Sequence, residues 1–246
     1  MTLTVASSEF NTKIGNGRTC ACAGTRQTSS HSANGTMRSS MGALVRNPKA
    51  WVALLCLLPL LRLVGLGFSG ELGANPIEFI TRSTGTWTLV GLLVTLSVTP
   101  LRRLTGRADL VRYRRMLGLF VFFYACLHFV TYVWLDQFFD PAAIARDIVK
   151  RPFITVGFTA FVLLLPLAVT STHTMMRRLG RRWQQLHRLV YVIALLGVIH
   201  FLWLVKKDLT EPLIFGAVLA LLLTLRLPWG VALLQAVRSR FASAKS

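Results

Sequence analysis

Acidic residues are scarce in this chain. Only 9 of its 246 residues are Asp or Glu, against 28 Lys or Arg, and charged residues make up 15% of the total. With 53% hydrophobic residues and a mean hydropathy of +0.55, the chain is too apolar for an ordinary soluble domain. The formal charge of +19 does not indicate a nucleic-acid binder, because the basic residues lie between apolar runs. The composition therefore predicts a membrane protein.

Cysteines are also few. Cys20 and Cys22 lie in a polar N-terminal segment, and Cys56 and Cys126 lie in apolar runs. A Cys-x-Cys pair with no second pair or histidine beside it is a weak metal signal, so neither a disulfide framework nor a zinc site is predicted. The chain also lacks an internal repeat at a fixed period and a long soluble insertion able to bind a nucleotide.

The N-terminal segment, residues 1–48, lacks apolar periodicity and holds a single acid. Its Ser-, Thr-, Asn- and Gly-rich composition predicts a disordered cytoplasmic tail, and a cleavable signal peptide would need an apolar core there. A later start, at Met37 or Met41, is left open. Residues 49–228 are expected to form one membrane domain, and residues 229–246 a basic cytoplasmic C-terminal tail.

Six apolar runs follow, each near the length at which a helix rising about 1.5 Å per residue crosses the hydrocarbon layer. The predicted fold class is therefore all-α, a polytopic membrane protein built as a bundle of six transmembrane helices. The expected spans are Trp51–Phe68, Thr86–Leu101, Met116–Leu135, Pro152–Thr170, Leu186–Val205 and Pro212–Leu227.

The distribution of basic residues predicts that both termini are cytoplasmic. Lys and Arg number 6 in the N-terminal tail, 6 from Arg102 to Arg115, 5 from Arg177 to Arg188 and 4 after Leu225, against 6 in the alternate loops. Seven of the nine acids lie in those alternate loops. The alternate loops are accordingly expected to be periplasmic.

Two histidines lie inside spans at matching depth. His128 is 13 residues past Arg115 and His200 is 18 past Arg182, on spans that both run outward. A lone intramembrane histidine more often only hydrogen-bonds a neighbouring helix. Two imidazoles at one level, however, are what a six-coordinate heme needs, so the pair favours heme b. The aromatic residues crowding these spans are Phe122, Phe123, Tyr124, Phe129, Tyr132, Trp134, Phe201 and Trp203.

His187 fits this arrangement less well. It lies 13 residues before His200, which at about 100° per residue rotates it by about 140° off the same face. A bulge or unwinding at Gly197 would correct the phase. His187 is thus open between a ligand of an inner heme and an interfacial hydrogen-bond partner. His173 is expected at the interface and His31 in the tail.

Arg62 is a single cation within the first span. An unpaired cation there costs about 2.5–3.5 kcal/mol. Two alternatives relieve this cost, namely an ion pair with a heme propionate at the periplasmic level or a side chain that reaches the outer headgroups.

At these residues the chain resembles the MsrQ family, the heme-binding membrane subunits of the bacterial protein-methionine-sulfoxide reductase system, related to the ferric reductase transmembrane family. The resemblance covers about residues 50–228, and the long N-terminal tail departs from the family pattern. The motifs that carry it are Leu72-Gly73-Ala74-Asn75-Pro76, Thr84-Gly85-Thr86-Trp87, Thr99-Pro100-Leu101-Arg102-Arg103, Arg114-Arg115-Met116-Leu117-Gly118-Leu119, Leu127-His128, Thr131-Tyr132, Arg151-Pro152-Phe153, Leu167-Ala168-Val169-Thr170-Ser171, Leu179-Gly180, Trp183, Leu186-His187 and Ile199-His200.

The resemblance implies that His128, His187 and His200 are heme-related. It implies an electron-transfer subunit, itself not an enzyme, that passes electrons from the quinone pool across a bacterial inner membrane. The acceptor would be a periplasmic molybdenum-containing methionine sulfoxide reductase subunit, which we expect to dock on the loop Asp136–Arg151. An FMN cofactor rests on the resemblance alone. The alternatives are a generic cytochrome b or ferric-reductase-like carrier for another acceptor, and a small transporter.

Overall fold

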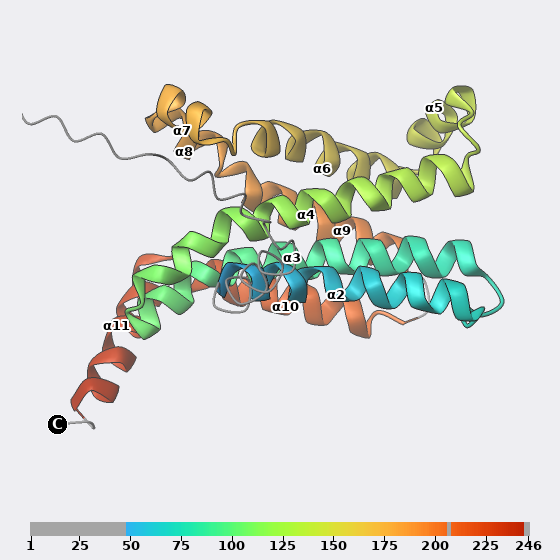
Figure 1. Ribbon diagram of the computed structural model, residues 1–246. Coiled ribbons are helices and arrows are strands. Elements are labelled where there is room, and N and C mark those ends of the chain that lie inside the picture. Colours follow the sequence, from blue (N-terminus) through green and yellow to red (C-terminus); the bar gives the residue numbers. More distant parts are fainter. Residues whose placement is uncertain (1–47, 206–207, 244–246) are drawn as a thin grey trace, which may run out of the picture. The chain divides into compact units, whose positions relative to one another are not determined.

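The computed structural model describes residues 48–205 and 208–243, and all regular structure in these ranges is helical (Figure 1). The predicted disorder of the N-terminal tail falls on residues outside the described ranges, apart from Pro48. The helices are α2 (Pro48–Ser69), α3 (Pro76–Thr105), η1 (Ala108–Leu110), α4 (Val111–Thr131), η2 (Tyr132–Asp136), α5 (Pro141–Lys150), α6 (Pro152–Val169), α7 (His173–Leu179), α8 (Arg181–Leu186), α9 (Leu189–Leu204), α10 (Thr210–Thr224) and α11 (Pro228–Ser243).

Among the residues that the structure describes, five helical segments are long and apolar enough to cross a membrane. A sixth span is present if α10 and α11, which are bent by 83° at a short break, are counted together. The prediction of an all-α polytopic membrane protein is confirmed. The five segments are Pro48–Ser69, Pro76–Thr105, Ala108–Asp136, Pro152–Val169 and Arg181–Leu204.

Helix α3 is much longer than the span expected at Thr86–Leu101. It has 30 residues and begins at Pro76, directly after Asn75, whose side chain accepts a hydrogen bond from the Glu78 amide. An Asn cap followed by proline at the first helical position is a strong start signal. The first three turns of α3 carry polar residues, and for that reason hydropathy alone did not include them.

Two segments expected to be a loop and a tail are helical. The loop Asp136–Arg151 contains α5, which Asp140 caps by accepting from the amides of Ala142 and Ala143. The C-terminal segment 229–246 falls largely on α11, which packs against α3. The last expected span, Pro212–Leu227, corresponds to α10, which has only 15 residues and ends at Thr224.

The core forms where α3 packs on α4 and α6 packs on α9 (Figure 1). Helix α2 contacts α3 and α4 but leaves half of its leucines exposed and none of them buried, as expected of a helix that faces lipid. The most deeply buried apolar side chains of the core are Leu96, Val121, Ile193, Ala194 and Leu219. The α3–α4 and α6–α9 pairs together frame the candidate site.

Candidate functional site

The rings of His128 and His200 face each other across the interior of the bundle. His128 lies on α4 and His200 on α9, with ring centroids 6.2 Å apart and ring planes at 76°. An imidazole nitrogen binds a transition metal at about 2 Å, so two opposed imidazoles on one metal ion have ring centroids roughly 6 Å apart. The two histidines that the helix depths paired are therefore brought together at a spacing that suits one metal ion.

Each imidazole is held by a backbone carbonyl on a facing helix. His128 Nδ1 lies 2.9 Å from the carbonyl oxygen of Thr81, and His200 Nδ1 lies 2.6 Å from that of Phe153. A carbonyl only accepts, so these bonds assign the proton of each ring to Nδ1 and leave the Nε2 lone pair free. A metal-binding histidine usually donates its other ring N–H in this way.

Each histidine also packs against a glycine. A Cβ at Gly85 would lie 3.0 Å from His128 Cε1, and one at Gly157 would lie 2.7 Å from His200 Nδ1. In both cases the accepting carbonyl belongs to the residue four before the glycine and 47 positions before the histidine. The pairs α3–α4 and α6–α9 thus repeat one arrangement, although no repeat is visible in the residue types.

A cavity of about 920 Å³ contains both histidines. Phe129 and Phe161 stack at 4.7 Å and 16° on its wall. Of the aromatic residues expected there, Phe129, Tyr132 and Phe201 line the cavity. Others do not, because Phe123, Trp134 and Trp203 are exposed and Tyr124 donates to the Cys56 carbonyl. The remaining aromatic lining comes from residues not predicted, namely Phe153, Phe158 and Phe161.

Polar groups gather in the lining from helix ends and loops. The cations there are Arg82 and Arg151, and the acids are Glu78, Asp136 and Asp208. Hydrogen bonds from Thr210 hold the pKa of the Asp208 carboxyl below its usual range. The hydroxyl of Thr81, which also lines the cavity, is buried without a hydrogen-bond partner. Heme b has a flat apolar ring with two propionates on one edge, so an apolar cavity with paired imidazoles, two cations and a free hydroxyl fits it.

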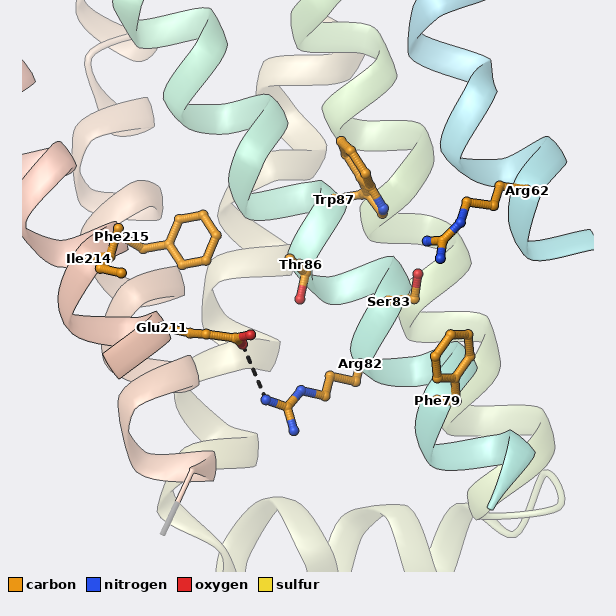
Figure 2. A pocket seen from close by; sticks show the side chains of 9 residues that line it. All are labelled: Arg62, Phe79, Arg82, Ser83, Thr86, Trp87, Glu211, Ile214 and Phe215. Atoms are coloured by element: carbon orange, nitrogen blue, oxygen red, sulfur yellow. Dashed lines mark hydrogen bonds and ion pairs between the residues drawn. The ribbon is translucent and has the colours of Figure 1, made fainter. Parts of the chain in front are cut away.

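Arg62 lies in a neighbouring groove of about 520 Å³ (Figure 2). It does not line the histidine cavity, whereas Arg82 and Thr86 line both. Arg82 Nη2 forms an ion pair with Glu211 Oε2 at 3.2 Å. Arg82 precedes the span expected at Thr86–Leu101 and was therefore not predicted as a propionate partner. The available signal was the helix start at Asn75, which places Arg82 two turns into α3.

His187 stands apart from the paired histidines. Its ring stacks on Trp183 at 4.0 Å and 29°, and its Nδ1 lies 3.1 Å from the Trp183 carbonyl oxygen. A bulge or unwinding was expected at Gly197, but Gly197 is inside the regular helix α9. The helix is interrupted instead at His187 and Arg188, between α8 and α9. Across the described part of the chain, no group of three or more His, Cys, Asp or Glu side chains could hold a metal ion.

The two other histidines lie away from this site. His173 is the first residue of α7 and is exposed, as expected of an interfacial position. His31 lies outside the described ranges.

Comparison with known proteins gives a consistent family signal. Residues 83–198 match the family model described as ferric reductase like transmembrane component. The protein named protein-methionine-sulfoxide reductase heme-binding subunit MsrQ from Herminiimonas arsenicoxydans is 58% identical over 184 residues, which are 74% of this chain and 84% of the relative. Its namesake from Ralstonia nicotianae is 61% identical over 181 residues, 72% of this chain and 83% of the relative. No solved structure matches.

Proposed function

The chain belongs to the MsrQ family of heme-binding subunits, and from this membership we propose that it holds heme b between His128 and His200 and passes electrons to a separate methionine sulfoxide reductase subunit. The observation that carries the proposal is the facing histidine pair, with each Nδ1 directed at a carbonyl. Bound there, heme b supplies a one-electron carrier within the membrane.

The residues of the chain have distinct roles in this proposal. His128 and His200 would ligate the heme through Nε2, and the carbonyls of Thr81 and Phe153 fix the orientation of the rings. The aromatic walls keep water from the ring and so help to set the reduction potential. Arg82 and Arg151 would hold the propionates, which would otherwise be unpaired carboxylates in a largely apolar cavity.

The electron donor that we propose is a membrane hydroquinone. Its oxidation releases two electrons, for which a heme held by His128 and His200 would supply a one-electron acceptor, and two protons, of which Glu211 would take one and water at the exposed groove the other. Phe79, Trp87 and Phe215 line the groove in Figure 2, each offering an aromatic face to a flat ring, and the groove shares Arg82 with the histidine cavity. The carboxylate of Glu211, paired with Arg82, is the proton acceptor in this groove.

The charge distribution supports the proposed orientation of the chain in the membrane, and the family supports the proposed electron acceptor. The excess of basic residues in alternate loops supports an orientation with both termini in the cytoplasm and the outward loops, including α5, in the periplasm of a bacterial inner-membrane protein. We propose that the periplasmic molybdenum-containing reductase subunit docks on Asp136–Arg151. The FMN that the family resemblance implies stays a prediction, and so does a second heme at His187.

The transporter alternative is tested by the absorption spectrum of the purified protein. A heme b carrier has an intense Soret band and sharp bands on reduction, and reduced protein should pass electrons to an added methionine sulfoxide reductase subunit. A folded protein that is colourless after expression with ample heme would support the transporter. Protein that binds heme but does not transfer electrons to that subunit would support the alternative of an electron carrier for another acceptor.

A further inference from the structure

Arg226 joins three helices at the break between α10 and α11. Its Nη2 donates to the Leu96 carbonyl at 2.6 Å, and its Nη1 donates to the Tyr191 hydroxyl at 2.5 Å. Leu96 lies four residues before Pro100, which has no N–H, so Arg226 satisfies a carbonyl that the helix leaves free. The Nε of Arg226 is buried and has no partner.

A second buried donor without a partner lies near this joint. Arg103 Nη1, close to the end of α3, is buried and unpaired. The charges of Arg103 and Arg114 both lie near enough to act on the Arg226 guanidinium. A buried N–H that belongs to a cation is costly to leave without an acceptor, and three like charges repel one another.

No carboxylate in the described part of the chain forms an ion pair with Arg103, Arg114 or Arg226. Asp109 is the only acid in segments 92–135 and 212–243, and it pairs with Arg112 at 3.6 Å. The other ion pairs among the described residues join Arg82 to Glu211 and Arg151 to Asp147. The geometry therefore calls for an anion from outside the chain.

Helix α11 indicates where that anion comes from. It turns by 83° from α10 and packs on α3, with the Arg238 guanidinium so close to Gly106 that a Cβ there would lie 2.8 Å from Nη2. Trp229 and Leu233 are 62% and 55% exposed, whereas Leu234 is buried. A helix that combines exposed apolar residues with arginines and turns away from a spanning helix is typical of one lying in the membrane interface.

We propose that this joint binds the phosphate group of an anionic phospholipid among Arg103, Arg114 and Arg226, with α11 lying in the headgroup layer beside it. The exposed Trp229 and Leu233 would contact the acyl chains near the headgroup. A lipid phosphate beside the joint neutralises part of the charge that the three guanidinium groups share. The site is separate from the paired histidines and does not depend on the proposed electron transfer.

The propionates of a second heme are the principal competing occupant, because Arg114 also acts electrostatically on His187. The test therefore measures lipid and heme separately on the full chain loaded with heme. The protein is exchanged into nanodiscs that contain phosphatidylcholine and phosphatidylglycerol. Native mass spectrometry then counts the lipids that stay bound to the protein after it is released from the nanodiscs. Heme is counted by the pyridine hemochrome.

We expect phosphatidylglycerol to be retained over phosphatidylcholine by roughly tenfold, a 1.4 kcal/mol preference. Arg103→Gln should abolish that preference and leave the heme-to-protein ratio unchanged. Arg177→Gln, at an exposed arginine of α7, is the matched control and should keep the preference.

Three results would overturn the proposal. The first is equal retention of the two lipids by the unmodified chain. This measurement needs no variant, so it holds even if a variant misfolds. A lower heme-to-protein ratio in Arg103→Gln would assign the arginines to heme propionates. Loss of the lipid preference on adding inorganic phosphate would show a site for free phosphate.

Discussion

Gly157 leaves the space that the His200 ring occupies. A Cβ at this glycine would lie 2.7 Å from His200 Nδ1 and 2.8 Å from Cε1, closer than carbon atoms of folded side chains approach. The ring is also tied to the Phe153 carbonyl on the same helix, so it cannot move away without losing that hydrogen bond. The absence of one side chain on α6 thus sets the position of a proposed heme ligand on α9.

Gly157→Ala should therefore displace His200 and weaken heme binding, with a loss of roughly 10–100-fold in affinity, the usual range for groups that orient a ligand. Gly118→Ala on α4 is the control, because a Cβ there meets nothing within 4 Å. It should leave heme binding unchanged and stabilise the helix by at most about 1 kcal/mol. Heme titration of the two apoproteins compares them, and equal affinities would refute the steric argument.

Arg82→Gln should lower the reduction potential of the bound heme. A cation beside the propionates favours the reduced state, and its loss is expected to shift the midpoint by roughly 60 mV, a tenfold change for a one-electron couple. Arg62→Leu should shift it much less, because Arg62 lines only the neighbouring groove. Potentiometric titration measures the midpoint potential of both variants. A larger shift in Arg62→Leu than in Arg82→Gln would identify Arg62 as the propionate partner.

Glu211→Gln should slow reduction by a short-chain hydroquinone by roughly 10²-fold, the lower range for loss of a general base. Reduction by dithionite should not change, because that reaction transfers no proton to the groove. Stopped-flow absorbance at the Soret band measures both rates. If Glu211→Gln accepts electrons from hydroquinone at the original rate, the donor does not use this groove.

His187→Ala tests whether the third histidine binds heme. The ring stacks on Trp183 and does not line the histidine cavity, so the spectrum of the heme in that cavity should survive the change. The heme-to-protein ratio then reports on a second heme: an unchanged ratio identifies an interfacial histidine. A lower ratio with the same residual spectrum identifies an inner ligand, and loss of all heme would contradict the separation seen here.

Much of the fold follows from hydropathy, and the pairing of His128 with His200 follows from depth counted along helices of known rise. Both inferences use only the length of a helix and the thickness of a bilayer. They do not depend on how side chains pack, and the structure accordingly has the all-α membrane fold and brings the two histidine rings together.

Features set by local hydrogen bonds were harder to predict. The start of α3 depends on the Asn75 cap, and α5 depends on Asp140, yet both lie in polar segments that hydropathy reads as loops. Arg82 was overlooked for the same reason. The helix irregularity was expected at Gly197, but the chain turns at His187, beside the Trp183 ring on which His187 stacks. Such tertiary contacts have no signature in one sequence.

The heme content of His128→Ala and His200→Ala tests the central claim most directly. Each variant removes one of two facing imidazoles, so six-coordinate ligation should fail in both, and the two should lose the same heme. The pyridine hemochrome of each purified variant, compared with the unmodified chain, should show the heme-to-protein ratio reduced equally. Full retention of six-coordinate heme in either variant would contradict the account.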